Sequence, residues 1–162
     1  MSEWKQVRLG DFATSFAGGT PSRDNDAFFG GSIPWIKSTE VNRDYVDYTE
    51  EHLTKLGLQC SAAKPITSGA VLMALYGATA GEVAMLRIDA TANQAVLAIT
   101  PVDTETSSQF LYYALVNEKP QILYKAQGSG QPNLSKSLID SLRLTLPPLP
   151  QQRKIARILT TV

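Results

Sequence analysis

Several short stretches of the chain either alternate hydrophobic and polar residues or are apolar throughout, and both patterns are typical of β-strands. Trp4, Val7 and Leu9 mark the first stretch, where they alternate with polar and charged residues. The most apolar stretch is followed, after a few small residues, by a second one, which predicts a hairpin over residues 69–87. Strands are expected at residues 4–9, 35–37 (after Pro34), 69–77, 81–86, 93–101 and 142–147.

In the second half of the chain the apolar residues take the spacing of a helix. Leu111 and Leu115 lie one turn apart, and Ser107 is placed to cap the long helix that they predict. Pro120 falls inside this helix and is expected to kink or divide it, because proline lacks the backbone N–H. Shorter helical segments are expected at residues 10–16 (capped by Asp11), 49–57 and 134–142.

Near the end of the chain, three prolines lie within four positions, at Pro147, Pro148 and Pro150. A helix-like run follows them, and its apolar residues have the three–four spacing of a helix seam over about one heptad. This is too short to establish a coiled coil. Isolated helices below about 12 residues are marginal in water. We therefore expect the segment to fray or to pack on its own domain, in a mainly monomeric chain.

The composition bounds the class of protein. The chain has 162 residues, which suits one domain, and 15 basic residues balance 15 acidic ones. A net charge of zero neither indicates nor excludes a nucleic-acid partner, because a local patch is enough to bind phosphate. The single cysteine, Cys60, fits a reducing compartment. No stretch has the length of a membrane span or the pattern of a signal peptide, so we expect a cytoplasmic protein without membrane contact.

Catalytic and cofactor motifs are scarce. His52 is the only histidine, so a zinc site of the usual ligands is not expected, and no serine has the glycine spacing of a nucleophile elbow. We interpret His52 as a surface or hydrogen-bonded residue. The glycine-rich residues 76–81 lie between two expected strands, which favours a turn over a phosphate-binding loop. We expect no cofactor and no metal.

Short polar side chains gather where the expected strands end. Asn and Gln match the edge of adenine, Lys reaches guanine, and Ser and Thr adapt to either, so these residues are candidates for base reading. The alternative is that they form turns and helix caps, as Asn and Ser commonly do. Asn133 is open to both interpretations. The polar residues are Lys37, Ser38, Thr39, Glu40, Asn42, Tyr76, Thr79, Asn93, Gln94, Lys125, Gln127, Ser129, Gln131, Asn133, Ser135 and Lys136.

Five runs together carry a resemblance to a known family: WKQVRLGDFATSFAGGTPS, GSIPWIKSTEV, GAVLMALYGATAGEVAM, NQAVLAITP and GSGQPNLSKSLIDSLRLTLPPLPQQRKIARIL. In order and spacing the chain resembles the target-recognition domain of type I restriction-modification specificity (S) subunits. The match covers nearly the whole chain, and the combination of Gly-Gly-Thr-Pro-Ser, Ile-Pro-Trp-Ile, Tyr-Gly-Ala-Thr and Leu-Pro-Pro-Leu-Pro-x-Gln is specific.

The resemblance implies an α/β fold of the α+β type, with a twisted, mostly antiparallel sheet, flanking helices and long loops. Residues 1–146 would form the target-recognition domain, and residues 147–162 a proline hinge and the start of a spacer helix. In that family two domains and two such helices make one subunit. The helices pair antiparallel and dock the methyltransferase subunits. One domain and the start of one helix are seen here, so we expect a truncated form or a fragment of a larger subunit.

The implied function is sequence-specific binding of double-stranded DNA, one half of a bipartite target, without catalysis. The implied partners are methyltransferase (M) subunits and, through them, restriction (R) subunits. Trp35 and Tyr76 are candidate stacking residues, although Trp35 is rather expected in the core. The candidate base contacts are Lys37, Ser38, Thr39, Asn42, Tyr76, Thr79, Asn93, Gln94, Gln131 and Asn133. The candidate phosphate contacts are Arg23, Lys125 and Lys136, and Lys37 is a candidate for this role as well.

Two other functions remain open from the residues alone. A hydrolase of unknown type would have to use His52, and its activity would be lost in His52→Ala. A protein-interaction module would use the terminal proline run as a ligand segment, and would bind a protein partner without salt-dependent affinity for DNA.

Overall fold

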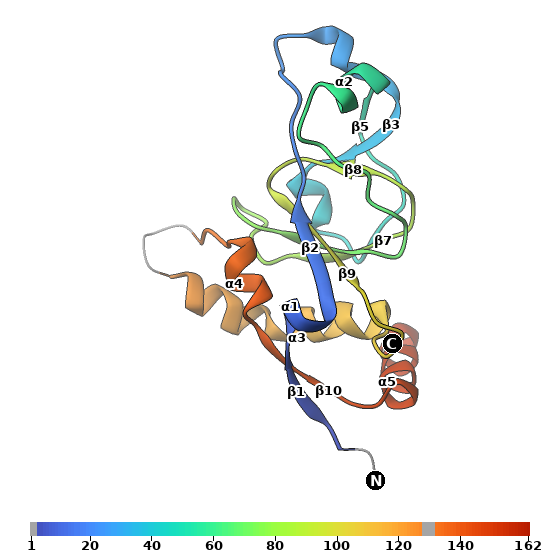
Figure 1. Cartoon of the computed structure of the whole chain (residues 1–162), viewed down its shortest axis with the longest axis vertical. Helices are drawn as coiled ribbons and strands as arrows, with labels where there is room; N and C mark the ends of the chain where they lie inside the picture. The colour runs from blue at the N-terminus through green and yellow to red at the C-terminus, as the bar shows by residue number, and fades with distance from the viewer. Residues whose placement is uncertain (1–2, 128–131) are drawn as a thin grey trace.

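The computed structural model describes residues 3–127 and 132–162, and its helices and strands form an elongated α+β molecule (Figure 1). Strand pairing is mostly antiparallel, as expected, but the strands form three sheets instead of one. In chain order the elements are β1 (Lys5–Arg8), α1 (Leu9–Phe12), β2 (Ala13–Ala17), η1 (Asp26–Phe28), β3 (Phe29–Ile36), η2 (Ser38–Val41), β4 (Tyr45–Val46), β5 (Glu51–Leu53), α2 (Lys55–Gln59), β6 (Val71–Ala74), β7 (Val83–Leu86), β8 (Thr91–Ala92), β9 (Val96–Pro101), α3 (Ser108–Ala126), α4 (Lys136–Asp140), β10 (Arg143–Leu146) and α5 (Leu149–Thr161).

The largest sheet has the strand order β2-β9-β6-β7-β4 and is buried on both faces. Alternate residues of β6 belong to two different apolar clusters. Val71 and Met73 pack with residues of α3 and α4, whereas Leu72 and Ala74 pack with Ile36 and other residues of the opposite face. Burial on both faces explains why this strand is apolar throughout. The pairing of β6 with β7 confirms the hairpin predicted for residues 69–87.

A smaller lobe, made of η1, β3, β5, α2 and β8, lies beyond one end of this sheet (Figure 1). Its core contains Trp35, which is 1% exposed and donates from Nε1 to the carbonyl of Gly19 at 3.0 Å. The expectation that Trp35 belongs to the core is confirmed. The connection into the lobe requires glycine, because a Cβ on Gly18 would lie 2.1 Å from the carbonyl oxygen of Ala92.

Two sequence predictions for this lobe are wrong. The strand expected after Pro34 begins at Phe29, and Pro34 lies inside it. Proline has no N–H to donate to a neighbouring strand, and β3 has a register shift against β5 just before it, between Phe29 and Ile33. The carbonyl of Pro34 accepts a hydrogen bond from Thr91 Oγ1 at 2.9 Å. The helix expected over residues 49–57 is instead a strand, β5, followed by α2. Thr54 caps α2, because its Oγ1 accepts from the N–H of Gly57 at 3.0 Å.

The helix predictions are borne out in part. Ser107 caps α3 as predicted, since its Oγ accepts from the N–H of Phe110 at 3.4 Å. Pro120 does not divide this helix, which runs without a break from Ser108 to Ala126. Asp11 is not a cap: it lies inside the single turn of α1, and its carboxylate accepts hydrogen bonds from Arg8.

The terminal helix α5 packs against α3, so the segment after the prolines lies on its own domain. The contact centres on Gln152, which is 2% exposed. Its Oε1 accepts from the N–H of Ser107 at 2.9 Å, and its Nε2 donates to the carbonyls of Glu105 at 3.0 Å and Pro147 at 2.8 Å. A single amide therefore joins the proline turn to the start of α3. This accounts for the glutamine at the end of the Leu-Pro-Pro-Leu-Pro-x-Gln run.

We predict that Gln152→Leu lowers the free energy of unfolding by about 2–4 kcal/mol, because it leaves one N–H and two carbonyls without their partner. The matched control is Gln151→Leu. Gln151 accepts one hydrogen bond, from Trp4 Nε1, in an exposed position, so its loss is expected to cost less than about 1 kcal/mol. Urea unfolding of the two variants measures the difference, and equal losses would contradict the role given to Gln152.

Candidate nucleic-acid interface

Strand register brings loops from distant parts of the chain to one edge of the large sheet. Leu97 of β9 pairs with both Ala17 of β2 and Met73 of β6, and Met73 pairs in turn with Val83 of β7. The loops that follow β2, precede β9 and join β6 to β7 therefore leave the sheet on the same side. We call this region the loop edge, and define it as residues 18–20, 37–42, 76–80, 93–95 and 132–134.

Hydrogen bonds connect these loops to one another. The N–H of Asn93 donates to the carbonyl of Ile36 at 2.8 Å, next to Lys37. Thr79 Oγ1 donates to the carbonyl of Ser38 at 3.0 Å, so the tip of the hairpin is tied to η2. Tyr76 forms a β-bridge with Asn133. The structure thus brings most of the predicted base contacts into one region.

The side chains of the loop edge differ in their solvent exposure and in their hydrogen bonds to the protein. Thr39, Asn42, Gln94 and Asn133 are exposed. Gln94 contacts Thr20 through a side-chain hydrogen bond. By contrast, Asn93 Oδ1 accepts from the N–H of Ala95 at 3.1 Å, which is the turn-forming role weighed above for Asn.

The alternative role for Asn133 as a helix cap is wrong. Ser135 caps α4, with its Oγ accepting from the N–H of Leu138 at 3.0 Å.

Tyr76 is 37% exposed, so its ring is partly open to solvent. Gln131 lies outside the residues that the structure describes, and base reading by every residue named stays a prediction.

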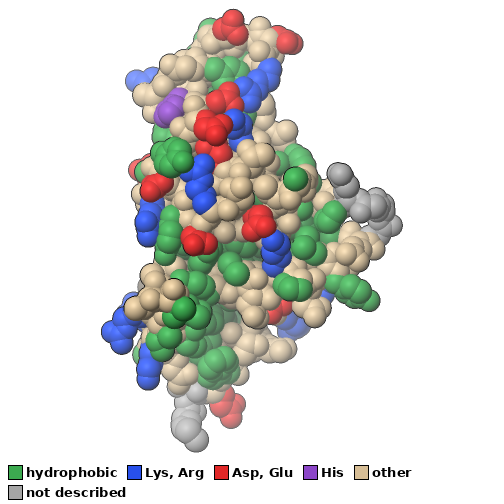
Figure 2. Space-filling view, turned by 180° about the vertical axis from the view of Figure 1, so that it is seen from behind, with side chains coloured by type: hydrophobic (Ala, Val, Ile, Leu, Met, Phe, Trp, Pro, Cys, Tyr) green, Lys and Arg blue, Asp and Glu red, His purple; other side chains and the backbone are tan. Residues whose placement is uncertain are grey.

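Most of the predicted phosphate contacts are paired with carboxylates. Arg23 donates two hydrogen bonds to Glu51, at 2.6 and 3.2 Å, while its guanidinium lies 4.7 Å from the ring centroid of Phe29. Lys37 Nζ lies 2.7 Å from Glu50. Figure 2 shows such alternation of basic and acidic side chains across the upper part of one face.

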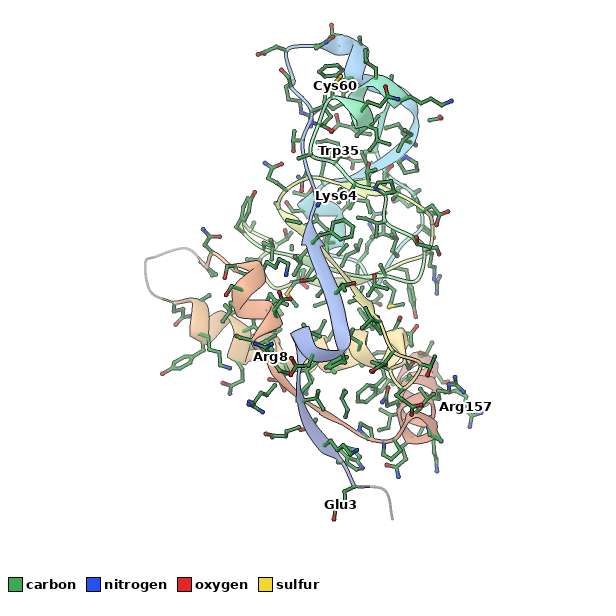
Figure 3. The ribbon with its side chains drawn as sticks, in the orientation of Figure 1. Glu3, Arg8, Trp35, Cys60, Lys64 and Arg157 are labelled. Atoms are coloured by element: carbon green, nitrogen blue, oxygen red, sulfur yellow. The ribbon has the colours of Figure 1, made fainter. Side chains whose placement is uncertain are left out.

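The remaining two predicted phosphate contacts differ from each other. Lys136 pairs with Asp140 on α4. Lys125, in the last turn of α3, is exposed and has no ion-pair partner within residues 3–127 and 132–162. Sequence reasoning missed Lys64. Its ammonium lies 5.6 Å from the ring centroid of Phe16, near the end of β2 that leads to the loop edge (Figure 3).

The ion pairs change the acid–base behaviour of the small lobe. Hydrogen bonding from Arg23 is the main cause that holds the pKa of Glu51 below its usual value of 4.5. Hydrogen bonding to Glu50 is the main cause that raises the pKa of Lys37. Both effects keep the groups charged at neutral pH, so Glu50 and Glu51 compete with any external anion for these two cations.

We predict that the Arg23–Glu51 pair contributes stability above the usual carboxyl pKa of about 4.5 and loses it as the pH falls through the lower pKa of folded Glu51. The difference in unfolding free energy between the wild type and Glu51→Gln should therefore shrink as the pH is lowered through this range. Denaturant unfolding at several pH values tests this. A carboxyl NMR titration of Glu51 with its midpoint above 4.5 would contradict it.

The sequence also gave no sign that Glu40 is buried. This residue lies in η2, between Thr39 and Val41, and is 2% exposed. Its neighbour Arg43 stacks on Tyr48, with 4.4 Å between the guanidinium carbon and the ring centroid. A buried carboxylate among exposed polar residues is visible only once the chain is folded.

Within the described part of the chain, no group of three or more His, Cys, Asp or Glu residues is arranged to hold a metal ion. His52 is half-buried on β5, in a shallow hollow that it shares with Glu50 and Glu51. No helix formed by residues 3–127 and 132–162 is long and apolar enough to cross a membrane.

The whole chain, residues 1–162, matches the family model of the type I restriction modification DNA specificity domain. The chain belongs to this family. It is 27% identical over 163 residues to the specificity subunit of the type I restriction enzyme EcoR124I/EcoR124II from Escherichia coli, covering 97% of this chain and 40% of that subunit. It is 28% identical over 148 residues to the HindI specificity subunit from Haemophilus influenzae, covering 89% of this chain and 32% of that subunit.

Solved structures agree with the fold. The HsdS subunit from Thermoanaerobacter tengcongensis superimposes with a TM-score of 0.72 at 21% identity, covering 98% of this chain and 37% of that one. The type I restriction-modification S subunit from M. genitalium superimposes with a TM-score of 0.72 at 15% identity. The match covers 99% of this chain and 39% of that subunit. At these identities the match shows the fold alone. The chain spans 40% or less of the length of these relatives and structures.

Proposed function

We propose that this chain binds double-stranded DNA and reads one half of a bipartite target for a type I restriction-modification complex, without catalysing a reaction itself. Methylation and cleavage would belong to separate methyltransferase and restriction subunits. Residues 1–146 would serve as the target-recognition domain, and residues 147–162 as the junction to a spacer helix. Membership of the specificity-domain family supports this proposal.

The observation that carries the proposal is the loop edge. Exposed Thr39, Asn42, Gln94 and Asn133 come from three separate segments of the chain and project from loops that backbone hydrogen bonds tie together. Amide side chains can form paired hydrogen bonds with adenine in the major groove. Groups held in place before binding lose less conformational entropy when they bind, which favours recognition.

The charge distribution supports a modest contribution from phosphates. Arg23, Lys37 and Lys136 are neutralised by carboxylates of their own chain. Among the basic residues near the loop edge, we propose Lys64 and Lys125 for backbone contacts, which position a protein on DNA but carry no sequence information. We expect binding of the isolated chain to be weak at physiological salt, because few phosphates are neutralised.

Enrichment from a library of randomised DNA duplexes, at low salt, tests the proposed function. The wild-type chain should enrich a short sequence motif, and the purified chain should neither hydrolyse ATP nor transfer a methyl group from S-adenosylmethionine to DNA. Failure to enrich any motif would count against DNA reading. Methyl transfer by the chain alone would contradict the non-catalytic role.

Asn133 and Lys125 separate base reading from phosphate contact. Asn133→Ala should cost about 1–3 kcal/mol on the enriched duplex and little on random DNA. Lys125→Ala should weaken both equally and lower the slope of log affinity against log salt by about 0.9. Fluorescence anisotropy titrations at several salt concentrations measure these effects. Because Ser135 is the cap of α4, Asn133→Ala should change folding stability by no more than about 0.5 kcal/mol.

A further inference from the structure

Glu40 is a buried carboxylate within a segment that carries candidate base-reading residues. It lies in η2 with Ser38 and Thr39, and Asn42 follows directly after this helix. Removing a carboxylate from water is costly unless hydrogen bonds and opposite charge compensate. Glu40 is 2% exposed, so its side chain cannot reach a ligand at the surface. Its contacts must therefore explain its presence.

Both carboxylate oxygens accept backbone hydrogen bonds. Oε2 accepts from the N–H of Lys37 at 2.9 Å, and Oε1 accepts from the N–H of Glu50 at 3.0 Å. Glu40 thus joins two points of the chain that are 13 residues apart. The side chains of Lys37 and Glu50 pair at the same place, at 2.7 Å.

Arg43 also contacts Glu40. Its Nε donates to the main-chain carbonyl of Glu40 at 3.1 Å, and its second guanidinium nitrogen lies 3.6 Å from the carboxylate. The positive charge offsets part of the cost of burying the negative one. The beginning of the segment is also held by Thr79, which donates to the carbonyl of Ser38.

We propose that Glu40 is a positioning residue for base reading: it sets the orientation of residues 38–42 without touching DNA. This inference rests on the proposed function. The carboxylate closes the loop between Lys37 and Glu50, so Thr39 and Asn42 project from a turn whose two ends are fixed. Sequence discrimination at the bases that these residues read then depends on a group that makes no contact with them.

The role requires two acceptor oxygens on one side chain. Glutamine has the same size, but its amide nitrogen is a donor and cannot accept from a backbone N–H. Glu40→Gln therefore breaks one of the two backbone bonds and weakens the attraction to Arg43. Aspartate keeps the charge but is one methylene shorter, so Glu40→Asp cannot reach Lys37 and Glu50 together.

The first measurement is amide hydrogen exchange on the free chain. Glu40→Gln should speed exchange of the amide that loses its bond, Lys37 or Glu50, about tenfold or more, because the local opening becomes easier. The β6 and β9 amides, which exchange through global unfolding, should speed up by no more than the loss of global stability measured by urea unfolding. Glu105→Gln makes the same change of charge in an exposed loop far along the chain and should leave these amides unaffected. Unchanged exchange in Glu40→Gln would overturn the proposal.

The second measurement is enrichment from a randomised duplex library with the same variants. Glu40→Gln should lose discrimination at the base positions that Asn42→Ala also affects, and keep it at those that Asn133→Ala affects. Affinity for unselected duplexes should stay within about twofold. A role limited to folding would lower discrimination at all positions together or at none, and either result would overturn the proposal.

Two further outcomes of these experiments also decide between the proposals. If Glu40→Gln does not fold, Glu40→Asp takes its place, and a folded Glu40→Asp with an unchanged motif would overturn the proposal. A wild-type chain that enriches no motif would overturn the proposed function itself. That failure is seen before any variant is compared, so it is distinguishable from a failure of the role given to Glu40.

Discussion

The pairing of β6 with β9 and β7 is the constraint on which the rest of the molecule depends. Val71 and Met73 face one apolar cluster and Leu72 faces the other, so a shift of one residue would exchange the two faces. Burial on both sides makes such a shift costly. The same register decides which strand ends are neighbours, and hence which loops meet at the loop edge. Core packing and the arrangement of the polar loops are consequences of one pattern of backbone hydrogen bonds.

Two buried polar side chains tie together segments that lie outside this sheet. Glu40 links backbone groups on the side of the small lobe, and Gln152 links them on the side of α5. Each satisfies groups from segments that are far apart in sequence. Such residues make the relative placement of segments specific, because an apolar residue of equal size would leave several backbone groups without partners.

Sequence reasoning succeeded where the signal was local. The hairpin of residues 69–87 follows from two apolar runs around a glycine-rich turn, and the cap at Ser107 from a serine just before a helical spacing. The family resemblance supplied the fold class, and the family match and the structure agree with it. The prediction failed for residues 51–53, because they form a strand only through pairing with β3, far earlier in the chain.

Much of the candidate site also depends on contacts that are distant in sequence. Arg23 and Glu51 are 28 residues apart, so their pairing has no local sign. The same holds for Glu40: it was visible as one polar residue among several, but its burial depends on the hydrogen bond from Glu50. The sequence left open whether Asn133 caps the helix that follows it, and only the start of α4 shows that Ser135 is the cap.

The charge balance of the chain has a kinetic consequence. The net charge is zero, and three of the predicted phosphate-contact cations, Arg23, Lys37 and Lys136, are held against carboxylates, so the long-range electrostatic attraction of the molecule for DNA is weak. Partners without electrostatic attraction associate at about 10⁵–10⁶ M⁻¹ s⁻¹, whereas oppositely charged ones reach about 10⁸–10⁹ M⁻¹ s⁻¹ at low salt. If the chain reads DNA, the time needed to find a target is then set by random collisions in the right orientation. A positively charged neighbour in an assembly would shorten that search without altering the loop edge.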